Sequence, residues 1–163
     1  MVRLVVDSLA YDFKGQKVVL LKDAAGRRIL PIWIGPDEAR AIALELEGLL
    51  TSRPQCHDLL YSILTLASAN IMRVVINDLT GDTFFATIEL DSPLGASLLD
   101  SRPSDAIALA VRARCPIFAA GNVVDALIAM DDLIAVHEAQ NPEPVKLPDD
   151  VARFERLLDG VNV

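Results

Sequence analysis

Apolar and polar residues alternate through much of the first 34 residues, a period of two that is typical of β-strands. Residues 3–9 and 17–21 are rich in aliphatic and β-branched side chains, and turn-forming residues lie between and after them. A third run covers residues 29–34 and contains Pro31, which has no N–H to donate to a neighbouring strand. We therefore expect three strands, the third of them at a sheet edge or carrying a bulge.

After Gly35 the apolar period lengthens to that of a helix. Ala39, Ile42, Ala43 and Leu46 fall on one face, and Pro36 suits the first turn. The later patterns predict a helix over 59–67, strands over 71–77 and 83–90, a loop or short strand over 93–99, a helix over 106–114, a short strand over 116–119, and a helix of about ten residues from Asn122.

Two parts of the chain are alike in sequence and in the order of their predicted elements. Residues 3–9, RLVVDSL, match residues 73–79, RVVINDL, and each part later carries the helical string AIAL. These matches predict an internal duplication over about residues 1–50 and 71–114. The expected fold class is therefore α+β, with two sequence-related β-rich units that are each followed by a helix.

The character of the sequence changes after residue 130. Residues 131–163 begin with acidic and proline-containing connector sequence, and an apolar stripe through Val151, Phe154 and Leu157 then follows Pro148. This pattern predicts an amphipathic helix. We expect a domain over residues 1–130 and an acidic linker with a C-terminal helix over residues 131–163.

The net charge of −8 argues against binding to nucleic acid or to an anionic membrane unless the charge is unevenly placed. It is uneven: residues 1–114 carry 12 basic and 14 acidic residues, and residues 115–163 carry 3 basic and 9 acidic residues. The acidic residues lie mainly in the C-terminal part. Residues 1–114 are nearly neutral, so the net charge of the chain does not exclude binding of nucleic acid to this part.

Several features indicate a reduced, cytoplasmic protein with no membrane partner. No apolar stretch reaches the roughly 18 residues of a membrane span, and the N-terminal residues lack the pattern of a secretory signal. The two cysteines, Cys56 and Cys115, form no CxxC pair. We expect Cys115 to be a buried apolar residue, and Cys56 has no visible third group that would make it a nucleophile.

A polar cluster at the start of the helix expected over 59–67 contains Arg53, His57 and Asp58. An imidazole is a natural general acid or base near neutral pH, and a carboxylate can orient it. Adjacent residues rarely achieve that geometry with each other, so the orienting carboxylate can also come from another part of the chain. In the alternative interpretation Asp58 caps the helix and His57 only precedes the cap. The sequence leaves both interpretations open.

A second cluster, Arg102, Ser104 and Asp105, opens the helix expected over 106–114. Pro103 and Asp105 favour a helix start without any ligand. In a functional interpretation the free N–H groups and Arg102 bind a phosphate, while Asp105 binds a metal or polarises water.

The third cluster lies at the helix that begins at Pro36. Glu38 either stabilises its own helix N-terminus or supplies a second carboxylate for a divalent ion. If the two duplicated units pack about a pseudo-twofold axis, Glu38 and Asp105 converge. We expect Trp33 and Ile34 to lie in the core rather than to form a base-stacking platform.

Ordered blocks of this sequence resemble the bifunctional nuclease family. The blocks are LPIWIG at 30–35, Glu38-Ala39, Ala41-Ile42, Arg53-Pro54, HDLL at 57–60, FFA at 84–86, RPSDAIAL at 102–109 and PIF at 116–118. The resemblance covers residues 1–130 and implies a compact α+β domain, often a homodimer or other homo-oligomer, that degrades RNA and DNA. The family's usual Thr before the His-Asp pair is Cys56 here, which removes a hydroxyl group.

The leading hypothesis is a nuclease that hydrolyses phosphodiester bonds of RNA and DNA with little sequence specificity. The catalytic candidates are His57, Asp58, Glu38 and Asp105, and the substrate-binding candidates are Arg53, Arg102 and Ser104. Mg²⁺ or Mn²⁺ would bind at Glu38 and Asp105, although no sequence feature requires a metal. The alternatives are a non-catalytic regulatory module that binds an anion or nucleotide, and an oligomeric scaffold.

Overall fold

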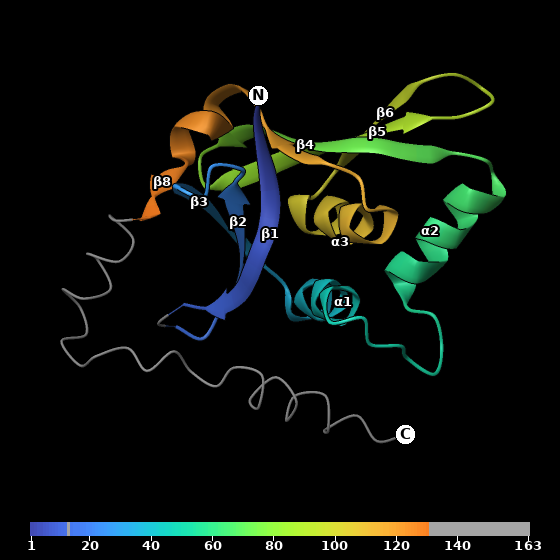
Figure 1. The fold of residues 1–163 in the computed structure, drawn as a ribbon, viewed down its shortest axis with the longest axis horizontal. Coiled ribbons are helices and arrows are strands. Elements are labelled where there is room, and N and C mark those ends of the chain that lie inside the picture. Colours follow the sequence, from blue (N-terminus) through green and yellow to red (C-terminus); the bar gives the residue numbers. More distant parts are fainter. Residues whose placement is uncertain (13, 131–163) are drawn as a thin grey trace. The chain divides into compact units, whose positions relative to one another are not determined.

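The computed structural model describes residues 1–12 and 14–130, so the predicted C-terminal helix lies outside the described residues. These residues form an eight-stranded sheet with helices packed against it (Figure 1). The elements, in chain order, are β1 (Val2–Tyr11), β2 (Lys17–Asp23), β3 (Arg28–Ile34), α1 (Pro36–Leu46), α2 (Cys56–Leu66), β4 (Asn70–Thr80), β5 (Thr83–Asp91), β6 (Ser97–Ser101), α3 (Pro103–Ala113), β7 (Ile117–Ala119), the 3₁₀ helix η1 (Gly121–Ala126) and β8 (Ile128–Ala129).

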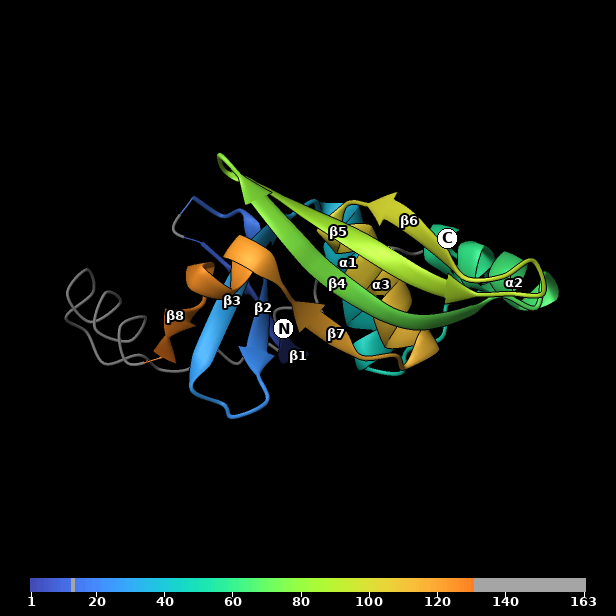
Figure 2. The same cartoon turned by 90° about the horizontal axis from the view of Figure 1, so that it is seen from above.

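The sheet is mixed, with strand order β6-β5-β4-β7-β1-β2-β3-β8. On one side of β7, strands β1, β2 and β3 form an antiparallel meander that is followed in the chain by α1. On the other side, strands β4, β5 and β6 form a second antiparallel meander that is followed by α3. The short strand β7 joins the two meanders, parallel to β4 and antiparallel to β1 (Figure 2). The α+β class is confirmed, and the duplication stays a prediction.

The proline in β3 lies where the sequence predicts an edge. Pro31 pairs with Leu20 of β2, while β8 on the other side of β3 reaches only Arg28 and Ile29. At Pro31 the outer side of β3 therefore has no strand partner among the described residues, as expected for a proline in a strand at a sheet edge.

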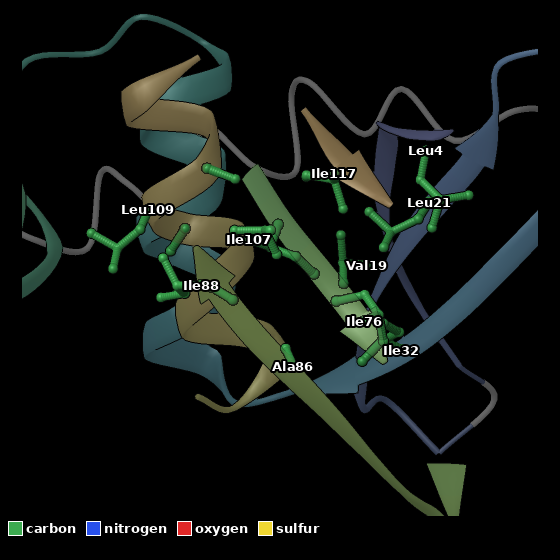
Figure 3. Packing of buried hydrophobic residues seen from close by; sticks show 14 of the residues in the cluster. Leu4, Val19, Leu21, Ile32, Ile76, Ala86, Ile88, Ile107, Leu109 and Ile117 are labelled. Atoms are coloured by element: carbon green, nitrogen blue, oxygen red, sulfur yellow. The ribbon is translucent and has the colours of Figure 1, made fainter. Parts of the chain in front are cut away.

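The core lies between the sheet and the helices α1 and α3, which pack against each other. Aliphatic side chains fill it, and α3 contributes an unbroken buried run from Ala106 to Ala110. Ile107 of α3 meets Ile76 and Ile88 from the sheet in the same apolar cluster (Figure 3). The two helices are thereby fixed on the sheet, and so are the residues at their N-terminal ends.

The segment from Asn122 is not the ten-residue helix that we expected. It is the six-residue η1 followed by β8. Gly121 has φ +57°, and a Cβ there would lie 3.1 Å from the carbonyl oxygen of Asn77. The Asn122 side chain also bonds to Asp78 and to the backbone of Leu79, so contacts with β4 hold the segment in a short turn.

The expectation that Trp33 lies in the core is wrong, since it is 54% exposed. Ile32 occupies the buried face of β3, and successive strand residues point to opposite faces, so Trp33 faces outward. Its indole N–H donates a hydrogen bond to Asp12 at 3.0 Å. The neighbouring Ile34 is partly buried against the core.

Among residues 1–12 and 14–130, none of the helices is long and apolar enough to cross a membrane.

Candidate active site

The first turns of the three α-helices supply the polar residues of the candidate site. In α1 and α3 a proline occupies the first helical position, and an acidic residue, Glu38 or Asp105, follows two positions later. Arg102 is the residue immediately before α3, and His57 is the second residue of α2. Proline fixes the start of α1 and α3, which sets where these two carboxylates project.

Arg102 binds the carboxylates in the first turns of both α1 and α3. Its Nη2 donates to Glu38 Oε1 at 2.6 Å, and its Nε donates to Asp105 Oδ2 at 2.7 Å. A further hydrogen bond of 3.1 Å joins Nη2 to Asp105 Oδ1. The structure therefore brings Glu38 and Asp105 to one place through a shared guanidinium group.

His57 joins this cluster from α2. Its Nε2 lies 3.0 Å from Asp105 Oδ1, although the two residues are 48 positions apart in the chain. The side chain of His57 is only 11% exposed, whereas that of Arg102 is 67% exposed. The cluster thus has a buried imidazole at one end and a solvent-facing cation at the other.

The charges in the cluster stabilise one another. Burial opposes ionisation of Asp105, but hydrogen bonds from Arg102 and His57 together hold its pKa below the usual range. Hydrogen bonds to Asp105 and Glu38 raise the pKa of Arg102. Asp105 is therefore a carboxylate, and Arg102 a cation, across the neutral pH range.

Asp58 makes a separate contact, also between α2 and α3. Its Oδ1 accepts a 2.7 Å hydrogen bond from Arg112 Nε, and its Oδ2 accepts the backbone N–H of Gln55 at 2.8 Å. Although burial opposes ionisation, these contacts hold the pKa of Asp58 below its usual value. Asp58 thus attaches α2 to α3 and completes the start of α2.

The alternative interpretation placed Asp58 at the N-cap of α2, and this is wrong, because Asp58 is the third residue of the helix. Gln55 is the N-cap residue of α2, and the reciprocal bonds between Gln55 and Asp58 form a capping box. Because α2 begins at Cys56, His57 lies inside its first turn, and its imidazole contacts Asp105 of α3.

Two of the predicted substrate-binding residues do not join the cluster. Ser104 is buried in the first turn of α3, and Arg53 is exposed in the loop before α2. Among the described residues no hydrogen bond connects either side chain to His57 or Asp105. Cys56 is exposed beside His57.

Two functional positions escaped the sequence reasoning. Arg112 is 5% exposed and also donates to the Ala108 carbonyl oxygen, yet a basic residue in a last helical turn usually signals only a favourable helix dipole. Gly35 lies against the Glu38 carboxylate, which a Cβ on Gly35 would contact. The signal in the sequence is its spacing, because Arg112 follows Ala108 by four positions and Leu109 by three, which places it beside apolar residues on one face of the helix.

The donor set does not fit a resident divalent cation at Glu38 and Asp105. In residues 1–12 and 14–130, no three His, Cys, Asp or Glu side chains are grouped to hold a metal ion. The guanidinium of Arg102 lies between the two carboxylates and binds both. A Mg²⁺ or Mn²⁺ ion bridging them would have to displace this cation.

A sequence model of the bifunctional nuclease domain matches residues 19–130. The chain belongs to the bifunctional nuclease domain family. Two uncharacterized proteins of Mycobacterium tuberculosis, from strains CDC 1551 / Oshkosh and ATCC 25618 / H37Rv, are each 37% identical to it over 150 residues. Each match covers 91% of this chain and 87% of the relative. In this bifunctional nuclease domain, the cluster from Glu38 to Asp105 lies entirely within the matched residues.

Proposed function

We propose that this bifunctional nuclease domain hydrolyses phosphodiester bonds of RNA and DNA with little sequence specificity. The observation that carries the proposal is the His57–Asp105 pair beside the exposed cation of Arg102. An imidazole oriented by a carboxylate is a proton-transfer pair, and a neighbouring guanidinium suits a phosphate.

His57 is the proposed general base. When Nε2 donates its proton to Asp105, the lone pair of the imidazole lies on Nδ1, where it accepts a proton from water. The ionised Asp105 stabilises the imidazolium that forms, and the imidazolium then returns a proton to the leaving oxygen. Water is the nucleophile that fits both substrates, because DNA lacks the 2′-hydroxyl of RNA.

Arg102 is the proposed phosphate-binding residue. Its Nε and Nη2 are used by Glu38 and Asp105, while Nη1 makes no hydrogen bond within the part of the chain that the structure describes. The guanidinium faces solvent at the N-terminus of α3, where free N–H groups also favour an anion. Contacts to phosphate carry no base information, which accounts for low sequence specificity.

Glu38 and Asp58 act as supporting carboxylates in this scheme. Glu38 orients Arg102 from α1, and Asp58 orients α2 through Arg112. Arg53 and Ser104 remain proposed substrate-binding residues, Arg53 as an exposed cation in the loop before α2. The cytoplasmic location and the homo-oligomeric state expected from the sequence remain part of the proposal.

Cleavage of end-labelled single-stranded RNA and DNA by the full chain tests the proposal. His57→Gln is expected to lower kcat/KM by at least about 100-fold, because it removes the proton acceptor while keeping a polar side chain. The matched control is His137→Gln, the same change at the other histidine of the chain. Both variants are purified identically, and their thermal unfolding midpoints are compared with that of the unmodified protein.

Equal cleavage by His57→Gln and His137→Gln would assign the activity to another site or to a contaminant. A parallel arm in EDTA checks the role of metal. Because the scheme uses only side chains of this protein, cleavage is expected to persist after divalent cations are removed.

One observation favours a second candidate, a non-catalytic module that binds an anion or nucleotide. The carboxylates of Glu38, Asp58 and Asp105 are all bound by Arg or His, so the cluster is satisfied without any reaction partner. A thermal-shift screen of nucleoside mono- and diphosphates separates the two candidates. Stabilisation by a nucleotide with no strand cleavage would favour the binding module.

A further inference from the structure

Trp33 lies near the end of β3, close to the guanidinium group of Arg102. Gly35 lies against the Glu38 carboxylate, and Glu38 Oε1 accepts the 2.6 Å hydrogen bond from Arg102. Because two residues of chain span at most about 7 Å, the Cα atom of Trp33 is within about 16 Å of the Arg102 guanidinium. Even at a rise of about 3.4 Å per nucleotide, a strand covers this distance in about five nucleotides.

The indole of Trp33 lies along the outer face of the sheet. Its N–H donates to Asp12, which follows the end of β1, and β2 lies between β1 and β3. Since neighbouring strands are about 4.8 Å apart, the ring extends across β2 towards Asp12. Val18 of β2 is the register partner of Trp33 and points to the same face. Val18 is 5% exposed although it is not part of the main apolar cluster, which agrees with an indole that lies over it.

One face of this indole is open to solvent. Trp33 is 54% exposed although its N–H is bound. Asp12 is held in place in turn, because it also accepts the backbone N–H groups of Lys14 and Gln16, each at 2.8 Å. A flat ring that is fixed at its edge, with one face on the sheet and the other in solvent, is a surface on which a nucleobase stacks.

A cation lies beside the same end of β3. Lys17 pairs in register with Ile34, the residue that follows Trp33. Its ammonium group lies 4.7 Å from the ring centroid of the exposed Tyr11, and no carboxylate pairs with it within residues 1–12 and 14–130. Proteins that bind single strands combine basic side chains along the phosphates with exposed aromatic rings for the bases. The end of β3 carries both.

We propose that Trp33 stacks on an unpaired base of a strand whose phosphate is bound by Arg102, so that single-stranded RNA and DNA are preferred over duplexes. The proposal rests on the proposed nuclease function and names its substrate class. A base in a duplex is stacked on its neighbours, so an aromatic side chain reaches the face of a base only in an unpaired strand. Stacking also tolerates any sequence, because every base has a π-face.

Intrinsic fluorescence tests the base contact directly, because Trp33 is the only tryptophan of the chain. The full chain carrying His57→Gln is titrated with an oligothymidylate of about ten nucleotides, so that the strand stays intact during the measurement. The fluorescence is expected to fall by at least about half at saturation. A strand of the same length with abasic sites in place of bases, and a hairpin duplex, are the comparison probes. Each is expected to quench by less than about one fifth.

Fluorescence anisotropy of the labelled oligothymidylate then compares three further substitutions in the His57→Gln background. Trp33→Leu is expected to raise Kd by about tenfold or more, because it removes the stacking face. Trp33→Phe keeps a ring but loses the N–H, and it is expected to raise Kd by less than about threefold. The matched control is Phe85→Leu, which removes another exposed ring, 40% against 54% for Trp33, with β4, β7, β1 and β2 between it and β3. Circular dichroism confirms that all variants are folded.

Equal Kd values for Trp33→Leu and Phe85→Leu overturn the proposal, as does equal quenching by the strands with and without bases. Equal quenching by the hairpin duplex also overturns it, because the ring would then not contact an unpaired base. Cleavage by the unmodified chain separates this failure from a failure of the proposed function. Quenching and a Trp33→Leu defect without cleavage would keep the base contact and remove the nuclease, whereas cleavage with no effect of Trp33→Leu would do the reverse.

Discussion

Replacing Arg102 by methionine tests whether this cation holds the N-termini of α1 and α3 together. The substitution keeps an unbranched side chain of similar length but removes three hydrogen bonds, of 2.6, 2.7 and 3.1 Å, to Glu38 and Asp105. It also leaves two carboxylates close together with no cation between them. The expected result is a loss of stability at neutral pH.

The magnitude follows from the exposure of the groups. A hydrogen bond to a charged group contributes about 1.5–3 kcal/mol when shielded, but an exposed ion pair contributes only about 0–1 kcal/mol. Arg102 is 67% exposed, whereas Glu38 and Asp105 are 17% and 27% exposed. We therefore expect the free energy of unfolding to fall by about 1–3 kcal/mol, which lowers the thermal midpoint by about 2–10 °C.

The loss should depend on pH. The native pKa of Asp105 is lowered, so its contribution to stability is complete above the carboxyl's ordinary pKa of about 3.9 and is lost as the pH falls through the native value. Arg102→Met removes much of that contribution. Urea unfolding at pH 7, 5.5 and 3 should show the same difference at pH 7 and 5.5 and a smaller difference at pH 3, where carboxylates are protonated.

Arg27→Met is the matched control, because Arg27 is exposed and makes no side-chain ion pair within residues 1–12 and 14–130. It is expected to change stability by less than about 0.5 kcal/mol. A loss in Arg102→Met no larger than in this control, or one that is the same at every pH, would refute the reasoning.

Three further predictions follow from neighbouring contacts. Arg112→Met leaves a partly buried carboxylate unpaired and is expected to cost about 2–4 kcal/mol in urea unfolding, and a cost below 1 kcal/mol would contradict this. Gly35→Ala displaces the flexible Glu38 side chain, so kcat/KM should fall while the thermal midpoint shifts by less than about 3 °C. With a thiol reagent at pH 7.5 the exposed Cys56 should react at least about tenfold faster than Cys115, whose pKa burial raises to about 11, and Cys56→Ser should remove the fast phase.

The strands and helices were largely predictable, because their apolar periods are local. The strand and helix periods and the proline punctuation locate β1 to β5, α1 and α3 within a few residues. The errors come from tertiary contacts. Trp33 has an apolar side chain, but it faces outward because successive residues of a strand point to opposite faces of the sheet. The Asn122 side chain bonds to β4, and this holds its segment in a turn.

The members of the site were predictable, and so was the approach of Glu38 to Asp105, but the partner of His57 was not. Residues with acid, base and cationic chemistry at helix starts identify Glu38, His57, Arg102 and Asp105 as candidates. Which helix N-termini meet depends on how α2 and α3 pack, and this brings together His57 and Asp105 over 48 positions of sequence. The sequence left open which carboxylate orients His57, and in the structure Asp105 contacts the imidazole while Asp58 binds Arg112.

The most direct measurement of the central claim is the ratio of kcat/KM for single-stranded RNA cleavage between the unmodified full chain and His57→Gln, at equal folded fractions. The account predicts cleavage by the unmodified protein and a ratio of at least about 100. A ratio near 1, or no cleavage by the unmodified protein under any condition that keeps it folded, would contradict the claim that His57 and Asp105 form a nuclease active site.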